Sequence, residues 1–141
     1  CLEFLLDLEI LTPEWKQALS QASFMFREGD ICFSDFDGIF YEHLMVYFIY
    51  RYFLKSVYDF QLLDKVKFAV FSCLAVRGTE AAVSREESLT SLEIARLYSK
   101  EIEYSEENME AVNEELLFSD MFDTQRLSEM VSAVFGSSCL I

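Results

Sequence analysis

Hydrophobic side chains recur at helical spacing along most of the chain. After Thr12-Pro13-Glu14, a typical helix start with proline in the first turn, they follow at intervals of three, four and seven residues. Gly29 stands where a left-handed cap would end such a helix. The pattern predicts an amphipathic helix before Gly29, with a buried stripe made of Trp15, Ala18, Leu19, Ala22, Met25 and Phe26.

A second segment, residues 39–58, is apolar on nearly every side. Fifteen of its 20 residues are apolar or aromatic, and Asp37-Gly38 precedes it as a start signal. The run from Val46 to Phe53 is rich in strand formers, but it lacks the alternation of a strand and the segment is far longer than strands usually are. We therefore expect a buried helix at the centre of a bundle, around which the other helices assemble.

Capping residues and glycines elsewhere in the sequence predict further helices. A capping box, Thr90-Ser91-Leu92-Glu93, starts one of them, and Ser105 either caps the next helix or lies inside one long helix. Residues 79–87 are expected as a polar connection in which Glu80-Ala81-Ala82 could form one helical turn. The other helices are expected at residues 2–9, at 62–77 with Gly78 as the stop, and at 124–135 between Asp123 and Gly136.

These elements predict one all-α domain over residues 1–141, an irregular bundle of about six helices with a frayed tail at 137–141. With 4 Gly and 1 Pro, the chain lacks the turn residues of an all-β sandwich or barrel. The chain opens at Cys1 inside an apolar stripe, so we expect a C-terminal fragment of a longer protein.

Charge and hydropathy argue against some classes of partner and of cellular location. The chain has 25 acidic and 11 basic residues, a net charge of −14 that repels nucleic acid. The longest uncharged apolar stretches, residues 43–50 and 68–76, are too short to span a membrane. Glu3 and Asp7 stand where a signal peptide would carry bases. A cytoplasmic protein is expected.

The four cysteines are widely separated, so no pair has the short spacing of a metal site. Cys1, Cys32, Cys73 and Cys139 are therefore interpreted as small core residues, and no metal is expected. His43, the only histidine, is interpreted as a helix-surface or hydrogen-bonded core residue, because no nucleophile is close to it in sequence.

Seven acids and no base lie between residues 101 and 115. One interpretation is a solvated helix face; the other is a docking surface for a lysine-bearing partner. The candidate substrate-binding residues are Glu101, Glu103, Glu106 and Glu107.

The aromatic helix offers a second candidate, a small-molecule pocket at Tyr47, Tyr50 and Arg51, although such a stripe is also typical of a core. Arg51 would need a partner if buried. Asp59, Asp64 or a glutamate from the helix that begins near residue 91 could provide it.

Two ordered segments carry a family resemblance. Residues 47–59 read YFIYRYFLKSVYD and are followed by LDKVKFAV at 63–70, and residues 98–108 read YSKEIEYSEEN. Together they resemble the C-terminal region of the bacterial flagellin lysine N-methylase family, over roughly residues 2–117.

The resemblance implies a part of an enzyme that transfers methyl groups from S-adenosylmethionine to lysines of flagellin. It also implies a cysteine-rich cluster, holding iron–sulfur or a metal, in a region absent from this sequence. No cofactor or catalytic residue is therefore expected in the chain itself. The expected role is substrate docking or scaffolding, with flagellin or another lysine-bearing protein as partner.

Three further expectations stay open. The alternative function is an acidic helical interaction module without catalysis, and a third reading places S-adenosylmethionine against the tyrosine-rich helix. A homodimer could also form through an apolar patch left on that helix.

Overall fold

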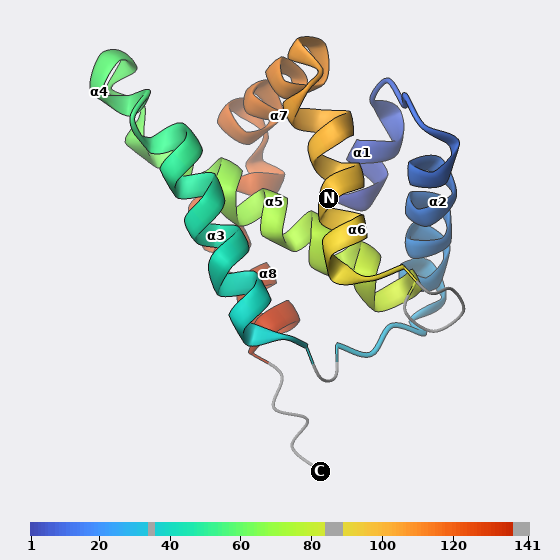
Figure 1. Ribbon diagram of the computed structural model, residues 1–141. Coiled ribbons are helices and arrows are strands. Elements are labelled where there is room, and N and C mark those ends of the chain that lie inside the picture. The colour runs from blue at the N-terminus through green and yellow to red at the C-terminus, as the bar shows by residue number, and fades with distance from the viewer. Residues whose placement is uncertain (34–35, 84–88, 137–141) are drawn as a thin grey trace.

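The computed structural model describes residues 1–33, 36–83 and 89–136, and this part of the chain is built from helices without a strand (Figure 1). The all-α prediction is confirmed; the expected polar loop at 84–87 and the frayed tail at 137–141 lie outside the described residues. The helices are α1 (Leu2–Asp7), α2 (Pro13–Glu28), α3 (Gly38–Phe53), α4 (Ser56–Asp59), α5 (Leu62–Val83), α6 (Ser91–Tyr98), the π-helical turn η1 (Ser99–Glu103), α7 (Glu106–Phe118), the 3-10 turn η2 (Asp120–Phe122) and α8 (Thr124–Phe135).

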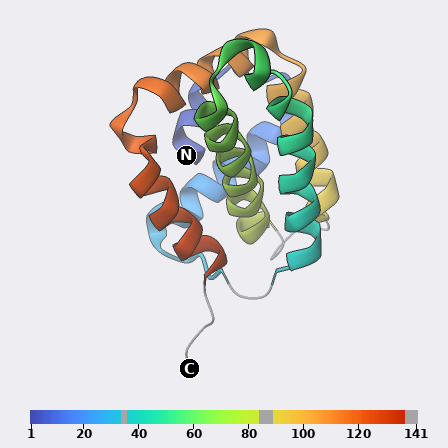
Figure 2. The same cartoon turned by 90° about the vertical axis from the view of Figure 1, so that its left-hand side faces the viewer.

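Helix α5 forms the centre of the bundle. It contacts α1, α2, α3, α6, α7 and α8, and Figure 2 shows it enclosed between α3 and α8. From Phe68 to Val83 nearly all its side chains are buried, whichever way they point. The buried hydroxyls of Ser72 and Thr79 donate to the carbonyls of Phe68 and Ala75, one turn earlier, so they cost no unpaired polar group.

The prediction that residues 39–58 form the central helix is wrong. In α3 only Tyr41, Phe48 and Tyr52 are buried, and its opposite side is exposed. The reason is side-chain size. Small residues in α5, such as Ala69, Ala75, Gly78 and Ala82, let other helices pack against all its sides, whereas α3 packs closely against α5 with one side only.

The segment is also not a single helix. Helix α3 ends at Phe53, and the short α4 follows after a turn in which the Ser56 hydroxyl donates to the Phe53 carbonyl. Asp59, the last residue of α4, accepts from the backbone N–H of Gln61, the residue directly before α5.

Gly78 does not stop α5, which continues to Val83. A glycine ends a helix when its backbone turns left-handed, as Gly29 does at φ 75° after α2, and Gly78 keeps φ negative. It lies where α5 packs against α1 and α2, facing the side chains of Leu2 and Phe26. Packing therefore overrides the low helix propensity of glycine.

The predicted helix starts are confirmed. Asp37 accepts from two backbone N–H groups of α3, Thr90 and Glu93 form a capping box at α6, and Asp123 caps α8. Ser105 caps α7 through the N–H of Asn108, so residues 91–118 are two helices joined at η1.

Of the cysteines, Cys73 is buried as expected, whereas Cys32 is exposed because it lies in the connection between α2 and α3; Cys139 lies outside the described residues. His43 is exposed on α3, one of the two placements expected. Within the described ranges, no helix has the length and hydrophobicity needed to cross a membrane, and no three metal-ligating side chains are grouped.

Candidate functional site

The first candidate acid, Glu101, is not a surface residue. It lies on η1 and is 1% exposed. Its carboxylate accepts a 2.7 Å hydrogen bond from the backbone N–H of Leu11 and a 2.5 Å bond from the Thr12 hydroxyl. Glu101 therefore satisfies polar groups at the start of α2, almost 90 positions earlier in sequence.

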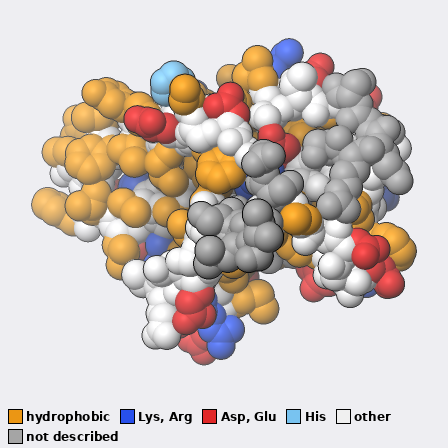
Figure 3. Space-filling model, turned by 90° about the horizontal axis from the view of Figure 1, so that it is seen from below, with side chains coloured by type: hydrophobic (Ala, Val, Ile, Leu, Met, Phe, Trp, Pro, Cys, Tyr) orange, Lys and Arg blue, Asp and Glu red, His pale blue; other side chains and the backbone are white. Residues whose placement is uncertain are grey.

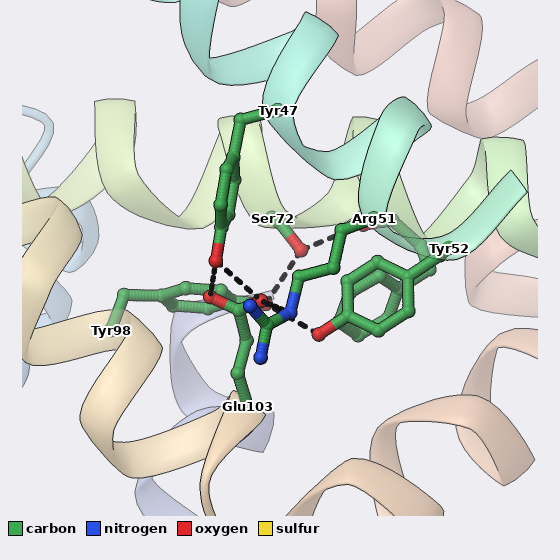
Figure 4. A network of polar contacts seen from close by, with 7 residues as sticks. Tyr47, Arg51, Tyr52, Ser72, Tyr98 and Glu103 are labelled. Atoms are coloured by element: carbon green, nitrogen blue, oxygen red, sulfur yellow. Dashed lines mark hydrogen bonds and ion pairs between the residues drawn. The ribbon is translucent and has the colours of Figure 1, made fainter.

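Glu103 lies two residues further along the same π-helical turn, and its side chain is also shielded from water, at 0% exposed. It accepts from the hydroxyls of Tyr52, at 2.6 Å, and Tyr47, at 3.1 and 3.2 Å to its two oxygens (Figure 4). Arg51 Nε completes the set at 3.0 Å. The expectation that Glu101 and Glu103 form part of an acidic surface is wrong, since both carboxylates bind groups of this chain.

Arg51 lies among three tyrosine rings. Its guanidinium carbon is 5.8 Å from the ring centre of Tyr47, 5.9 Å from Tyr52 and 6.0 Å from Tyr104. These distances are at the outer range of cation–π attraction. The predicted ion-pair partner from the helix after residue 91 is confirmed as Glu103, although the Arg51 side chain is 41% exposed and not fully buried.

The environment keeps these tyrosines protonated. Burial raises the pKa of Tyr52, and its bond to Glu103 raises it further. Burial is also the main reason that the pKa of Tyr47 is raised. Both hydroxyls therefore act as hydrogen-bond donors to the carboxylate at neutral pH rather than as bases.

Below this network, Tyr98 fixes the end of α6. It is 0% exposed, packs edge-on against Trp15, and bonds through its hydroxyl to Ser72 Oγ at 2.8 Å. Because Ser72 donates its own hydrogen to the Phe68 carbonyl, Tyr98 is the donor in this pair. The bond holds the end of α6, from which η1 continues, against the central helix (Figure 4).

The structure divides the predicted tyrosine pocket. Tyr47 and Arg51 turn toward Glu103, but the Tyr50 side chain is 77% exposed on the outer side of α3. Position 51 follows Tyr47 by one turn on the side that faces η1, whereas position 50 is rotated by about 100° around the helix from position 51, toward the exposed side. These three side chains therefore do not line one pocket.

Five further acids of the segment lie on α7, and four of them are exposed to solvent. Glu106, Glu107, Glu110 and Glu114 are all exposed. Asn108 anchors the helix beneath them, because its buried amide donates to the carbonyls of Glu9 and Glu101 at 2.7 and 2.9 Å. The exposed acids thus stand on a fixed helix.

Two features escaped the sequence analysis. One is an open groove of about 760 Å³ between the start of α2 and α6–η1, where Glu14 and Glu93 balance Arg96 and Lys100. Its walls come from segments about 75–90 positions apart, so no local pattern could reveal it.

The other is a buried cluster around Glu80, in a segment expected to be a polar connection. Glu80 pairs with Arg77 at 2.9 Å and accepts from the Tyr41 hydroxyl at 2.5 Å and from the Ser91 hydroxyl. The Arg77–Glu80 spacing of three along a helix was the available signal. The cluster ties α3 and α6 to the end of α5.

Comparison with known proteins adds the decisive observation. The family model described as FliB lysine N-methylase C-terminal domain matches residues 10–130. The chain belongs to this family. The match includes α2 to α7, and therefore both glutamates of η1 and the exposed acids of α7. No curated protein and no solved structure matches the chain.

Proposed function

We propose that this chain is the substrate-docking region of a flagellin lysine N-methylase, and that the exposed acids of α7 contact the lysine-bearing protein. Membership of the lysine N-methylase family supports an acceptor that carries lysines. The observation that carries the docking role is the line of exposed carboxylates at Glu107, Glu110 and Glu114, spaced by three and four on one helix.

The negative charge of the exposed α7 acids would favour the approach and binding of a lysine-bearing substrate. Exposed carboxylates attract a cationic side chain over about 8–10 Å and speed its encounter, while each exposed pair adds roughly 0.2–1 kcal/mol. Such a surface gathers and orients a substrate without taking part in chemistry. Glu101 and Glu103 keep α2, α3 and η1 together, and so hold α7 in place.

The methyl transfer itself is assigned to another part of the enzyme. In the proposal S-adenosylmethionine and the cysteine-bound cluster belong there, and flagellin is the substrate. The competing function is a stand-alone interaction module; family membership favours the enzyme.

Kinetics of the intact methylase test the proposal. In E107K/E110K/E114K, the Michaelis constant for flagellin should rise about tenfold at low salt with kcat nearly unchanged, because only encounter and binding are affected. E28K/E42K/E129K is the matched control, since it reverses three exposed acids elsewhere and changes net charge equally. Equal Michaelis constants in the α7 variant and the wild type would remove the docking role.

A further inference from the structure

A broad apolar face covers the outer side of α3, α4 and the first turns of α5. On α3 its residues are spaced by three and four, opposite the buried Tyr41, Phe48 and Tyr52. Figure 3 shows hydrophobic side chains gathered over this side of the molecule. The apolar face consists of Val46, Ile49, Tyr50, Phe53, Leu54, Val57, Tyr58, Phe60, Leu62, Leu63 and Val66, which are 37–90% exposed.

The area of this face exceeds what a monomer usually exposes. Tyr50, Phe53, Tyr58 and Phe60 are 77%, 42%, 87% and 90% exposed, so these rings alone present about 600 Å². With the aliphatic members, the face reaches about 1,000 Å². The largest apolar patch of a typical monomer is about 300–600 Å², and a stable interface takes about 800 Å² from each partner.

The charge around the face also differs from the rest of the chain. Residues 38–67 hold four bases and three acids, a net charge of +1, whereas the whole chain carries −14. Lys65 is already paired with Asp59 at 2.9 Å, and Arg51 with Glu103 at 3.0 Å. Two such faces can therefore meet without charge repulsion.

The tip of the face is held in shape by its backbone. Phe60 adopts a left-handed conformation, φ 58°, and its N–H bonds to the Ser56 carbonyl at 2.9 Å. Such a conformation is strained for a bulky residue, and here it turns the chain from α4 into α5 with the ring in water. Aromatic rings are enriched at protein interfaces relative to the rest of the surface.

From area, charge and shape together, we infer that two copies of this chain associate through the apolar face as a closed, two-fold dimer. The same patch then serves both subunits, which is the commonest arrangement of soluble homo-oligomers. This inference does not depend on the substrate-docking role, because the acids of α7 are not part of the face.

Analytical ultracentrifugation of the 141-residue chain, at about 1–100 μM, tests whether the dimer forms. The wild type should sediment as a dimer, and L54E/Y58E should raise the dissociation constant at least about a hundredfold, because each carboxylate would be buried without a partner. Both side chains are 68% and 87% exposed, so the subunit should keep its fold, which circular dichroism checks.

Phe118→Glu is the matched control, since this ring is 82% exposed on α7, outside the apolar face. It should leave the dimer intact. A monomeric wild type at 100 μM, an open-ended series of oligomers, or dissociation by Phe118→Glu rather than L54E/Y58E would each overturn the inference. A monomeric wild type would leave the face to another part of the methylase.

Discussion

The Tyr52 hydroxyl donates to the Glu103 carboxylate at 2.6 Å, across 51 positions of sequence. This bond joins α3 to η1 and places an acid, expected on a docking surface, inside the fold. Glu103 has four polar contacts with three side chains of α3, so the carboxylate is structural.

Glu103→Ala should lower the free energy of unfolding by about 2 kcal/mol. The substitution leaves the hydroxyl of Tyr52 without its acceptor, whereas Arg51, at 41% exposed, is partly rehydrated. Urea unfolding followed by circular dichroism measures the change. Tyr52→Phe should cost less, about 1 kcal/mol, because it removes a single bond; a Glu103→Ala variant as stable as wild type would contradict the structural role.

Glu101→Ala should destabilise the fold by about 2–3 kcal/mol, because the Leu11 N–H and the Thr12 hydroxyl both lose their partner. Glu107→Ala, at an exposed position of α7, is the control and should stay within about 0.5 kcal/mol of wild type. Thermal denaturation measures the melting temperatures of both variants, and that of Glu101→Ala should be the lower one. Equal melting temperatures would mean that Glu101 is not a structural acid.

Two glycines should respond in opposite directions to alanine. Gly78→Ala should stabilise the protein by about 0.5–1 kcal/mol, because the helix gains propensity and the new methyl group meets Leu2 and Phe26 at an ordinary 3.5–3.6 Å. Gly29→Ala should destabilise by about 1 kcal/mol, since its φ is 75°. Destabilisation by Gly78→Ala would show that α5 has no room there.

Stability should fall in alkaline solution. Burial raises the pKa of the Cys73 thiol to about 12 and also raises the pKa of Tyr98. The folded state keeps these protons at pH values where the unfolded chain loses them, so stability is full below about pH 9 and declines as pH rises further. Urea unfolding between pH 7 and 11 measures this decline.

Tyr98→Phe isolates the contribution of the Tyr98 hydroxyl to this alkaline loss of stability. Above pH 10 its stability should decline less steeply than that of wild type, by about 1.4 kcal/mol per pH unit. Tyr58→Phe is the control, because a side chain that is 87% exposed changes environment little on unfolding. A slope unchanged by Tyr98→Phe would contradict the protonated, buried hydroxyl.

Local patterns predicted the elements well and the packing poorly. Caps such as Asp37, Thr90 and Asp123 act through neighbours in sequence, so their side chains could be interpreted directly. Which helix occupies the centre depends on how closely neighbours approach, and the small residues of α5 decide that against the more hydrophobic α3. Hydrophobicity alone does not measure this.

The candidate site could likewise be predicted only in part from the sequence. The acid-rich stretch was visible, but its division into buried and exposed acids depends on the π-helical turn, which brings Glu101 and Glu103 to partners 51 to 90 positions away. The Arg51–Glu103 pair was within reach, because a charge among aromatic residues requires a partner.

Direct binding of flagellin to the 141-residue chain tests the central claim that exposed acids of α7, not the buried glutamates of η1, dock the substrate. Calorimetric titrations at low and physiological salt should show weaker binding for E107K/E110K/E114K and a smaller salt dependence than for wild type, with E28K/E42K/E129K unchanged. Identical affinities and salt dependences for all three proteins would contradict it.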